Sequence, residues 1–184
     1  ASAIECYGLS NVTQSGDSVF RADRSTIIGC VAEIDSGAGA AGAAFKINTG
    51  FRHNTLLNCI AINSDSDGAA SHVGINLSSS NSSTSVVLNC TIHGFAKGIE
   101  HEEGDSSVTS PNIYHGNLIY SCGDGIVNSQ GGTTNTNGQY VFNNAFGAIT
   151  SNTVSNMSIN FNPITLTETP FVDTENFELN NAPG

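Results

Sequence analysis

Hydrophobic residues in this chain come in short runs that polar and glycine-rich turns separate. The runs STIIGCVAEI (25–34), TLLNCIAIN (55–63), SVVLNCTIH (85–93) and GQYVFNNAF (138–146) are rich in β-branched and aromatic residues. Gly, Asn, Asp and Ser bound them, which is typical of strands and turns. No segment carries apolar residues at helical spacing over three turns. The pattern therefore predicts a chain that is almost entirely β.

The runs repeat. LLNCIAIN (56–63) and VLNCTIHG (87–94) are nearly the same, and cysteines at 6, 30, 59 and 90 are spaced by 24, 29 and 31 residues. Asn117 and Asn144 continue the series at intervals of 27 residues. A period of 20–50 residues indicates a solenoid, a propeller or an array.

A second element, which usually begins with glycine, recurs in the same frame. It reads GAAFKIN (42–48), VGINLS (73–78), KGIEH (97–101) and DGIVN (124–128). Matching KGI with DGI pairs Ile99 with Ile126, Ile92 with Ile119 and Cys90 with Asn117.

Repeats of two or three short strands without a helix select a parallel β-helix, in which each repeat is one coil. We predict an all-β, single-stranded right-handed parallel β-helix (solenoid) of about six coils. The coils occupy residues 1–160, and residues 161–184 form an irregular C-terminal closing segment of the same domain. The length of 184 residues suits one domain.

The repeated cysteine is predicted to be a core residue. Alternate residues of a strand point inward, which predicts Leu57, Cys59 and Ala61 in the core, and likewise Leu88, Cys90 and Ile92. Stacked coils form ladders, so we predict an inward-facing structural ladder of Cys6, Cys30, Cys59, Cys90, Asn117 and Asn144. The preceding Asn58 and Asn89 are expected to point outward or towards a turn.

Disulfides and metal binding are the alternatives for the cysteines. Their number is odd, and none lies in a C-x-x-C pair with zinc spacing. In-register neighbours would hold their Cβ atoms about 4.8 Å apart, against the roughly 3.8 Å of a relaxed disulfide. Core packing is therefore favoured, and Cys122, which lies off the ladder, is the candidate exception.

Two coil motifs carry a resemblance to a known family. LNCTIHGFAKGI (88–99) and IYHGNLIYSCGDGI (113–126) resemble right-handed parallel β-helix proteins of the pectin-lyase-like superfamily. The tail NPITLTETPFVDTENFELNNAPG (162–184) resembles closing segments of β-helix proteins from phages and environmental bacteria. That superfamily includes lyases, hydrolases, tailspikes, adhesins and spacers, so the resemblance implies the fold more narrowly than the function.

The enzymes of that superfamily use basic residues and paired carboxylates, and this chain contains few candidates for either role. Its lyases use a carboxylate-bound Ca²⁺ and a Lys or Arg base, yet the chain has five basic residues, and the frame places Lys97 over Asp124 as an ion pair. Its hydrolases need two carboxyl groups about 5–9.5 Å apart. Glu100 and Asp124 could approach across coils, but an acidic rim explains them as well. We expect no catalytic residues, and a polysaccharide lyase or glycoside hydrolase stays an alternative.

Metal sites are also not indicated. DSDG (65–68) and EHEEGD (100–105) are rich in oxygen ligands but lack the spacing of a calcium loop. The histidines form no H-x-x-x-H pair. We therefore expect no metal and no cofactor.

The net charge of the chain excludes some classes of binding partner. The formal net charge is −11 and 11% of residues are charged, which argues against nucleic acid and against anionic membrane surfaces. No apolar run approaches the roughly 20 residues of a transmembrane helix.

These observations predict a non-catalytic structural or attachment module of a phage particle: a fibre, a spike or a capsid decoration. The alternative is a bacterial surface protein that binds carbohydrate. The expected location is the virion, or the extracellular or cell surface. The expected partners are other virion or surface proteins, further copies of the chain (a trimer, by analogy with tailspikes) and polysaccharide. Tyr114, Tyr120 and Asp124 are the candidate glycan contacts, and clustering of Tyr114, Tyr120 and Tyr140 on one face would favour the binder.

Overall fold

A computed structural model describes residues 2–11, 18–36, 42–49, 53–64, 72–79, 84–103, 111–129, 139–155, 157, 159–173 and 178–179. Within these ranges the regular structure is all β-strand, and no helix occurs. The prediction of an all-β chain is confirmed.

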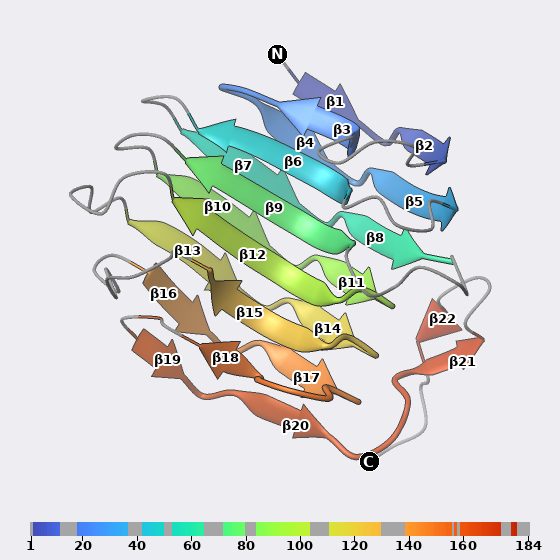
Figure 1. The fold of residues 1–184 in the computed structure, drawn as a ribbon, viewed down its shortest axis with the longest axis vertical. Helices are drawn as coiled ribbons and strands as arrows, with labels where there is room; N and C mark the ends of the chain where they lie inside the picture. Colours follow the sequence, from blue (N-terminus) through green and yellow to red (C-terminus); the bar gives the residue numbers. More distant parts are fainter. Residues whose placement is uncertain are drawn as a thin grey trace.

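Most strands lie in three parallel sheets that run along the length of the molecule (Figure 1). Sheet A consists of β1 (Ser2–Ile4), β4 (Thr26–Ile28), β7 (Asn54–Leu57), β10 (Ser85–Leu88), β13 (Asn112–His115), β16 (Gln139–Phe142) and β19 (Ile159–Phe161). Sheet B consists of β2 (Tyr7–Asn11), β5 (Val31–Ser36), β8 (Ile60–Asn63), β11 (Thr91–His93), β14 (Leu118–Tyr120), β17 (Ala145–Gly147) and β20 (Ile164–Leu166). Sheet C consists of β3 (Ser18–Ala22), β6 (Ala43–Thr49), β9 (Val73–Ser79), β12 (Lys97–Glu103), β15 (Asp124–Asn128) and β18 (Val154–Ser155).

The order of the strands defines a parallel β-helix. Each of the first six coils contributes one strand to sheet A, then one to sheet B, then one to sheet C, and the last described coil contributes β19 and β20 to sheets A and B. Each strand pairs with its equivalent in the next coil. Ile92 pairs with Ile119, and Ile99 pairs with Ile126. The coil frame read from the sequence is thereby confirmed. Strands β19 and β20 continue sheets A and B past residue 160, where the sequence suggested that the coils end.

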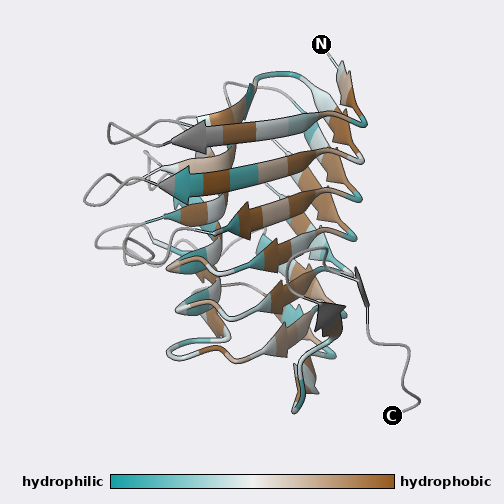
Figure 2. Cartoon of the chain, turned by 90° about the vertical axis from the view of Figure 1, so that its right-hand side faces the viewer, coloured by the Kyte–Doolittle hydropathy of each residue, from teal (hydrophilic) through white to brown (hydrophobic). Residues whose placement is uncertain are grey.

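The core is filled by inward residues of the strands in the inner coils, one from most short strands and two or more from the longer ones. These side chains stack coil upon coil, and Figure 2 shows hydrophobic positions recurring on successive strands. The buried set includes Ile27, Leu56, Val87, Tyr114 and Val141 from sheet A; Ala32, Ala61, Ile92, Ile119 and Phe146 from sheet B; and Phe45, Ile75, Ile99 and Ile126 from sheet C.

The corner between sheets A and B has the same construction in every coil. It is two residues long, and the first residue always has a positive φ, as at Gly29, Asn58, Asn89 and Asn143. Glycine has no Cβ to clash in the left-handed region, and asparagine tolerates that region better than most residues. This requirement explains why Asn or Gly usually precedes the repeated Cys or Asn.

The corner also corrects one prediction about the core. Leu57 and Leu88 were expected inside, but the neighbouring Leu56 and Val87 are the buried residues, each 1% exposed. Side chains alternate between inward and outward along a strand, but the left-handed residue at the corner breaks this alternation. The alternation therefore cannot be counted from one strand through the corner into the next. Asn58 and Asn89 are exposed, as predicted.

The recurring glycine of sheet C reflects close packing between coils. A Cβ on Gly98 would lie 2.7 Å from the carbonyl oxygen of Gly125, and one on Gly74 would lie 2.6 Å from that of Gly98. Such distances exclude any side chain, so glycine is required at the start of these strands.

The C-terminal segment turns back onto the coils. Strand β21 (Phe171–Asp173) pairs antiparallel with β22 (Glu178–Leu179), and this pair lies beside sheet B (Figure 1). The Phe171 ring packs edge-on against His93 and Tyr120, with centroids 5.9 Å from each, and Phe171 is 3% exposed. The closing segment thus covers part of the outer face of sheet B.

Candidate functional site

The predicted core ladder occupies the second residue of each A–B corner. Cys30, Cys59, Cys90, Asn117 and Asn144 are buried there, one per coil. Cys6 differs, because it is exposed; its coil supplies β1 and β2, which have a neighbouring strand on one side only.

The two asparagines of the ladder are satisfied by hydrogen bonds between coils. The Cys90 N–H donates to Asn117 Oδ1 at 2.9 Å, and the Asn117 N–H donates to Asn144 Oδ1 at 2.8 Å. Their amide groups donate in turn to the carbonyls of Val87 (3.1 Å) and Tyr114 (2.9 Å). A buried polar group is stable when its partners are present, so Asn can replace Cys in these coils.

The four buried thiols are free, and the pKa of three of them is raised. Cys59 differs, because its hydrogen bond with Cys90 lowers its pKa. A hydrogen bond shared with Cys59, together with burial, raises the pKa of Cys90 well above its usual value. Burial raises the pKa of Cys30, and it raises the pKa of Cys122 to about 11. Cys122 is 1% exposed, so it is a core residue like the others and not an exception.

The three candidate glycan contacts do not form one site. Tyr114 lies inside the core with no exposed surface, and its hydroxyl donates to Gln139 Oε1 at 3.3 Å. Tyr120 lies on the outer face of sheet B against His93 and Phe171, while Asp124 begins a strand of sheet C. Tyr140 lies on the outer face of sheet A, stacked on Phe142. The three tyrosines therefore do not form the cluster that would favour a carbohydrate binder, because one ring points inward and the other two face different sides.

The charged side chains of sheet C form a local ion-pair network. Lys97 and Asp124 are paired in register, as predicted, but the Lys97 ammonium bonds to Glu100 of its own strand. Asn76 Nδ2 donates to the other Glu100 oxygen at 3.1 Å. Burial by itself would raise the pKa of Glu100, but the bonds from Lys97, Ser129 and Asn76 outweigh it and lower that pKa.

Asp124 is held in a similar way. Its Oδ1 accepts bonds from the backbone N–H (2.9 Å) and the side-chain amide (3.1 Å) of Asn152 in the next coil. Burial opposes ionisation, yet the bonds from Asn152 and Ser151 and the nearby Lys97 lower the Asp124 pKa. Both carboxylates are therefore structural anions at neutral pH, and neither has the raised pKa of a general acid.

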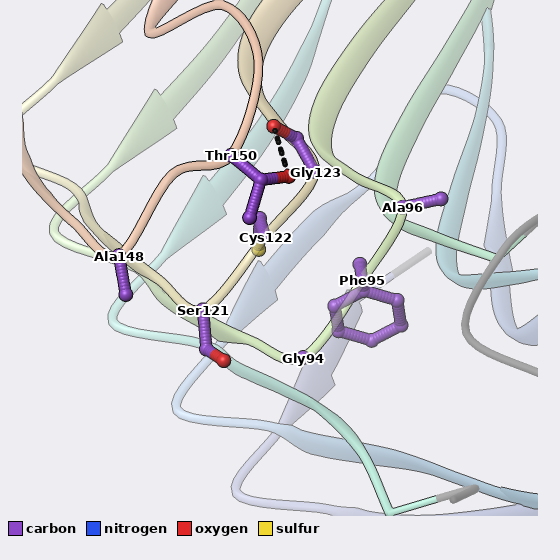
Figure 3. Close-up of a pocket in the computed structure, with 8 residues that line it drawn as sticks. All are labelled: Gly94, Phe95, Ala96, Ser121, Cys122, Gly123, Ala148 and Thr150. Atoms are coloured by element: carbon purple, nitrogen blue, oxygen red, sulfur yellow. Dashed lines mark hydrogen bonds between the residues drawn. The ribbon is translucent and has the colours of Figure 1, made fainter.

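A shallow hollow of about 380 Å³ lies where the turns after β11, β14 and β17 meet (Figure 3). Turn residues of three successive coils line it: Gly94, Phe95, Ala96, Ser121, Cys122, Gly123, Ala148 and Thr150. Its lining holds no charged side chain, and Cys122 is a weakly acidic thiol. The hollow thus offers no acid, base or activated nucleophile.

The outer face of sheet A has an uncharged and largely apolar composition. Its outward positions form two rows across the coils, which we call the outer rows of sheet A. One row is Ser2, Thr26, Thr55, Val86, Ile113, Tyr140 and Ile159; the other is Ile4, Ile28, Leu57, Leu88, His115, Phe142 and Phe161. The sequence analysis did not predict this face. The signal was present, because the buried residues Ile27, Leu56 and Val87 are each followed by a second apolar residue, which must then point outward.

Metal and membrane features can be stated for the described ranges. Across them, no three His, Cys, Asp or Glu side chains gather in a way that could hold a metal ion, and DSDG (65–68) lies outside these ranges. The described residues also include no helix of the length and apolarity that a membrane crossing requires.

Comparison of the chain with protein-family models, with curated proteins and with solved structures finds no match. The class of the protein is therefore given by its fold, a parallel β-helix, and its function has to be argued from its own surfaces.

Proposed function

We propose that this chain is a non-catalytic structural or attachment module of a larger assembly. The observation that carries the proposal is the outer face of sheet A, which presents apolar side chains without charge over seven strands. A contiguous apolar patch of this kind marks a site of contact with another macromolecule more often than a site of reaction.

The polar groups support the same assignment. Glu100 and Asp124, the carboxylates considered for hydrolysis, are committed to bonds that stabilise the stack. Lys97, the base considered for a lyase, is paired with Glu100. A lyase or hydrolase would need these groups free to exchange protons with a substrate.

We further propose that the assembly is a phage particle, in which the chain serves as a fibre, spike or capsid decoration. The likeness of its tail to phage closing segments supports this finer assignment, as does the polar, low-lysine composition. The partners would be other virion proteins and further copies of the chain, and polysaccharide would be contacted on an outer face. The location would be the virion, or the extracellular surface if the assembly is bacterial.

The proposal is tested by two measurements. Incubation of the purified protein with pectate, alginate, chondroitin and host-derived polysaccharides, with and without Ca²⁺, is expected to give no unsaturated products and no new reducing ends. Products that disappear in Glu100→Gln or Asp124→Asn would instead show an enzyme. Mass spectrometry of purified particles from the source culture should then find the chain as a stoichiometric component, and its absence from every particle would contradict the virion assignment.

A further inference from the structure

We propose that the outer rows of sheet A form the face on which a second copy of this chain packs. This inference rests on the proposed function as a structural module, and it names the partner and the surface.

Three of the five exposed side chains on this face are large and apolar, and they lie on its first and last strands; the other two are Ser2 and His115. Ile4, Ile159 and Phe161 are 60%, 43% and 62% exposed. Towards the C-terminal end of the sheet, the Tyr140 and Phe142 rings stack with centroids 6.3 Å apart, and Phe161 follows at 6.5 Å. Aromatic residues are enriched in protein interfaces relative to the rest of the protein surface.

The distribution of charge selects this face for self-association. The seven strands of sheet A contain no Asp, Glu, Lys or Arg. Sheet B, by contrast, carries Glu33, and sheet C carries Arg21, Lys46, Lys97, Glu100 and Asp124 among others. Two copies with a formal charge of −11 each repel one another, and the repulsion is least where they meet through uncharged strands.

Sheet B is a poorer candidate, because the chain already occupies part of it. Phe171 of the closing segment packs on His93 and Tyr120 in the middle of that face. A basic partner would be drawn to the acidic residues of the other sheets and would gain nothing electrostatic on sheet A. A second copy has the same uncharged face to offer in return, as a two-fold contact requires.

The dimensions are compatible with such a contact. Seven strands about 4.8 Å apart and about three residues wide give a flat footprint of roughly 30 by 10 Å. A standard interface buries about 800 Å² per partner and consists of an apolar centre with a polar rim. The footprint has the size of such an apolar centre. We therefore expect a concentration-dependent association.

The first test is sedimentation of the full chain over about a hundredfold range of concentration. Leu88→Lys places a charge in the middle strand of the face and should weaken self-association about tenfold or more. Ile60→Lys, at a half-buried outward position of sheet B, is the matched control and should leave association unchanged. Because lysine lowers the net negative charge in both variants, a loss confined to Leu88→Lys cannot come from overall charge.

The second test uses disulfide crosslinking and introduces no charged side chain. Cys6→Ser removes the exposed thiol, and Val86→Cys then places a thiol on the central strand, where a two-fold contact brings the same residue of both copies together. Mild oxidation should crosslink this variant. Cys6→Ser with Thr91→Cys, on the neighbouring strand of sheet B, should stay uncrosslinked.

A chain that is monomeric at every concentration, or an oligomer that Leu88→Lys leaves intact, would overturn the proposal. Loss of polysaccharide binding in Leu88→Lys, with a monomeric parent, would also overturn it and make the face a glycan platform. These outcomes leave the proposed non-catalytic function standing, whereas depolymerising activity would overturn that function whether or not the chain self-associates.

Discussion

Asn117 directs two hydrogen bonds to a single atom of Asn144. Its backbone N–H and its side-chain amide both donate to Asn144 Oδ1, each at 2.8 Å. The Asn144 amide donates in turn to the carbonyl of Tyr114. The ladder changes from thiols to amides one coil earlier, between Cys90 and Asn117, and three hydrogen bonds between coils depend on the buried Asn144 side chain.

Asn144→Ala should therefore be more destabilising than an ordinary asparagine substitution. Removal of the side chain leaves the Asn117 backbone N–H and the Tyr114 carbonyl without these partners in the core, which costs about 2–3 kcal/mol of unfolding free energy. Urea denaturation measures the change. The control is Asn160→Ala, at an exposed position of β19, which should cost less than about 0.5 kcal/mol. Equal effects of the two substitutions would refute a structural role for the amide ladder.

The left-handed corner can be tested by a pair of substitutions at one position. Asn58 has a φ of 54°, where glycine is free of strain and alanine is not. Asn58→Gly should change stability little, whereas Asn58→Ala should cost on the order of 1 kcal/mol. Thermal unfolding of the two variants gives the comparison, and an Asn58→Ala protein as stable as the Asn58→Gly protein would contradict the corner geometry.

Phe171 should anchor the closing segment. Phe171→Ala removes the ring that packs on His93 and Tyr120 and should cost on the order of 3 kcal/mol for detachment of the segment. Limited proteolysis should then cleave after the last coil much faster than in the parent protein. Phe161→Ala, whose ring is 62% exposed, is the control and should leave the rate unchanged.

His93 should make that anchor sensitive to pH. Burial lowers the His93 pKa, so the folded state favours the neutral ring. The stability that this residue contributes is present above its unfolded pKa of about 6.5 and is lost as the pH falls below that value. Unfolding free energies measured between about pH 5 and 7 should decline on acidification, and His93→Phe should reduce the decline. Phe171→Ala should reduce it as well, since it exposes His93; an unchanged slope in both variants would exclude this histidine as the cause.

Thiol labelling should distinguish the five cysteines. Cys6 is exposed, while Cys30, Cys59, Cys90 and Cys122 are buried. Ellman's reagent under native conditions should therefore label Cys6 quickly and the other four after unfolding. Cys6→Ser should abolish the fast phase, and Cys59→Ser should destabilise the protein by about 1–3 kcal/mol because it buries a hydroxyl in the core. Fast labelling of all five thiols would contradict the buried ladder.

The sequence predicted the coil frame well because the frame is a property of repetition. The pairings of Ile92 with Ile119 and Ile99 with Ile126 follow from aligning one repeat with the next, whatever the local conformation. The directions of Leu57 and Leu88 were predicted wrongly because they depend on a backbone angle at Asn58 and Asn89 that alternation ignores.

The candidate site was less predictable for a related reason. Tyr114 shares the inward position of Leu56 and Val87, so its polar tip lies in the core beside Gln139. The docking of Phe171 on His93 joins segments without any periodic relation, and no repeat could have indicated it. The Lys97–Glu100 pair depends on which of two nearby carboxylates the ammonium reaches, which spacing alone does not decide.

The constant two-residue corner between sheets A and B has a consequence for insertions and deletions. The two other connections of a coil differ in length from coil to coil, from three residues between β11 and β12 to ten between β15 and β16. Added or lost residues there leave the inward position of the next coil unchanged, whereas a single-residue change at the A–B corner would turn the following strand over. Foreign peptides should therefore be tolerated in the variable connections, and the same chain could display them along the two edges where sheet C is joined to sheets B and A.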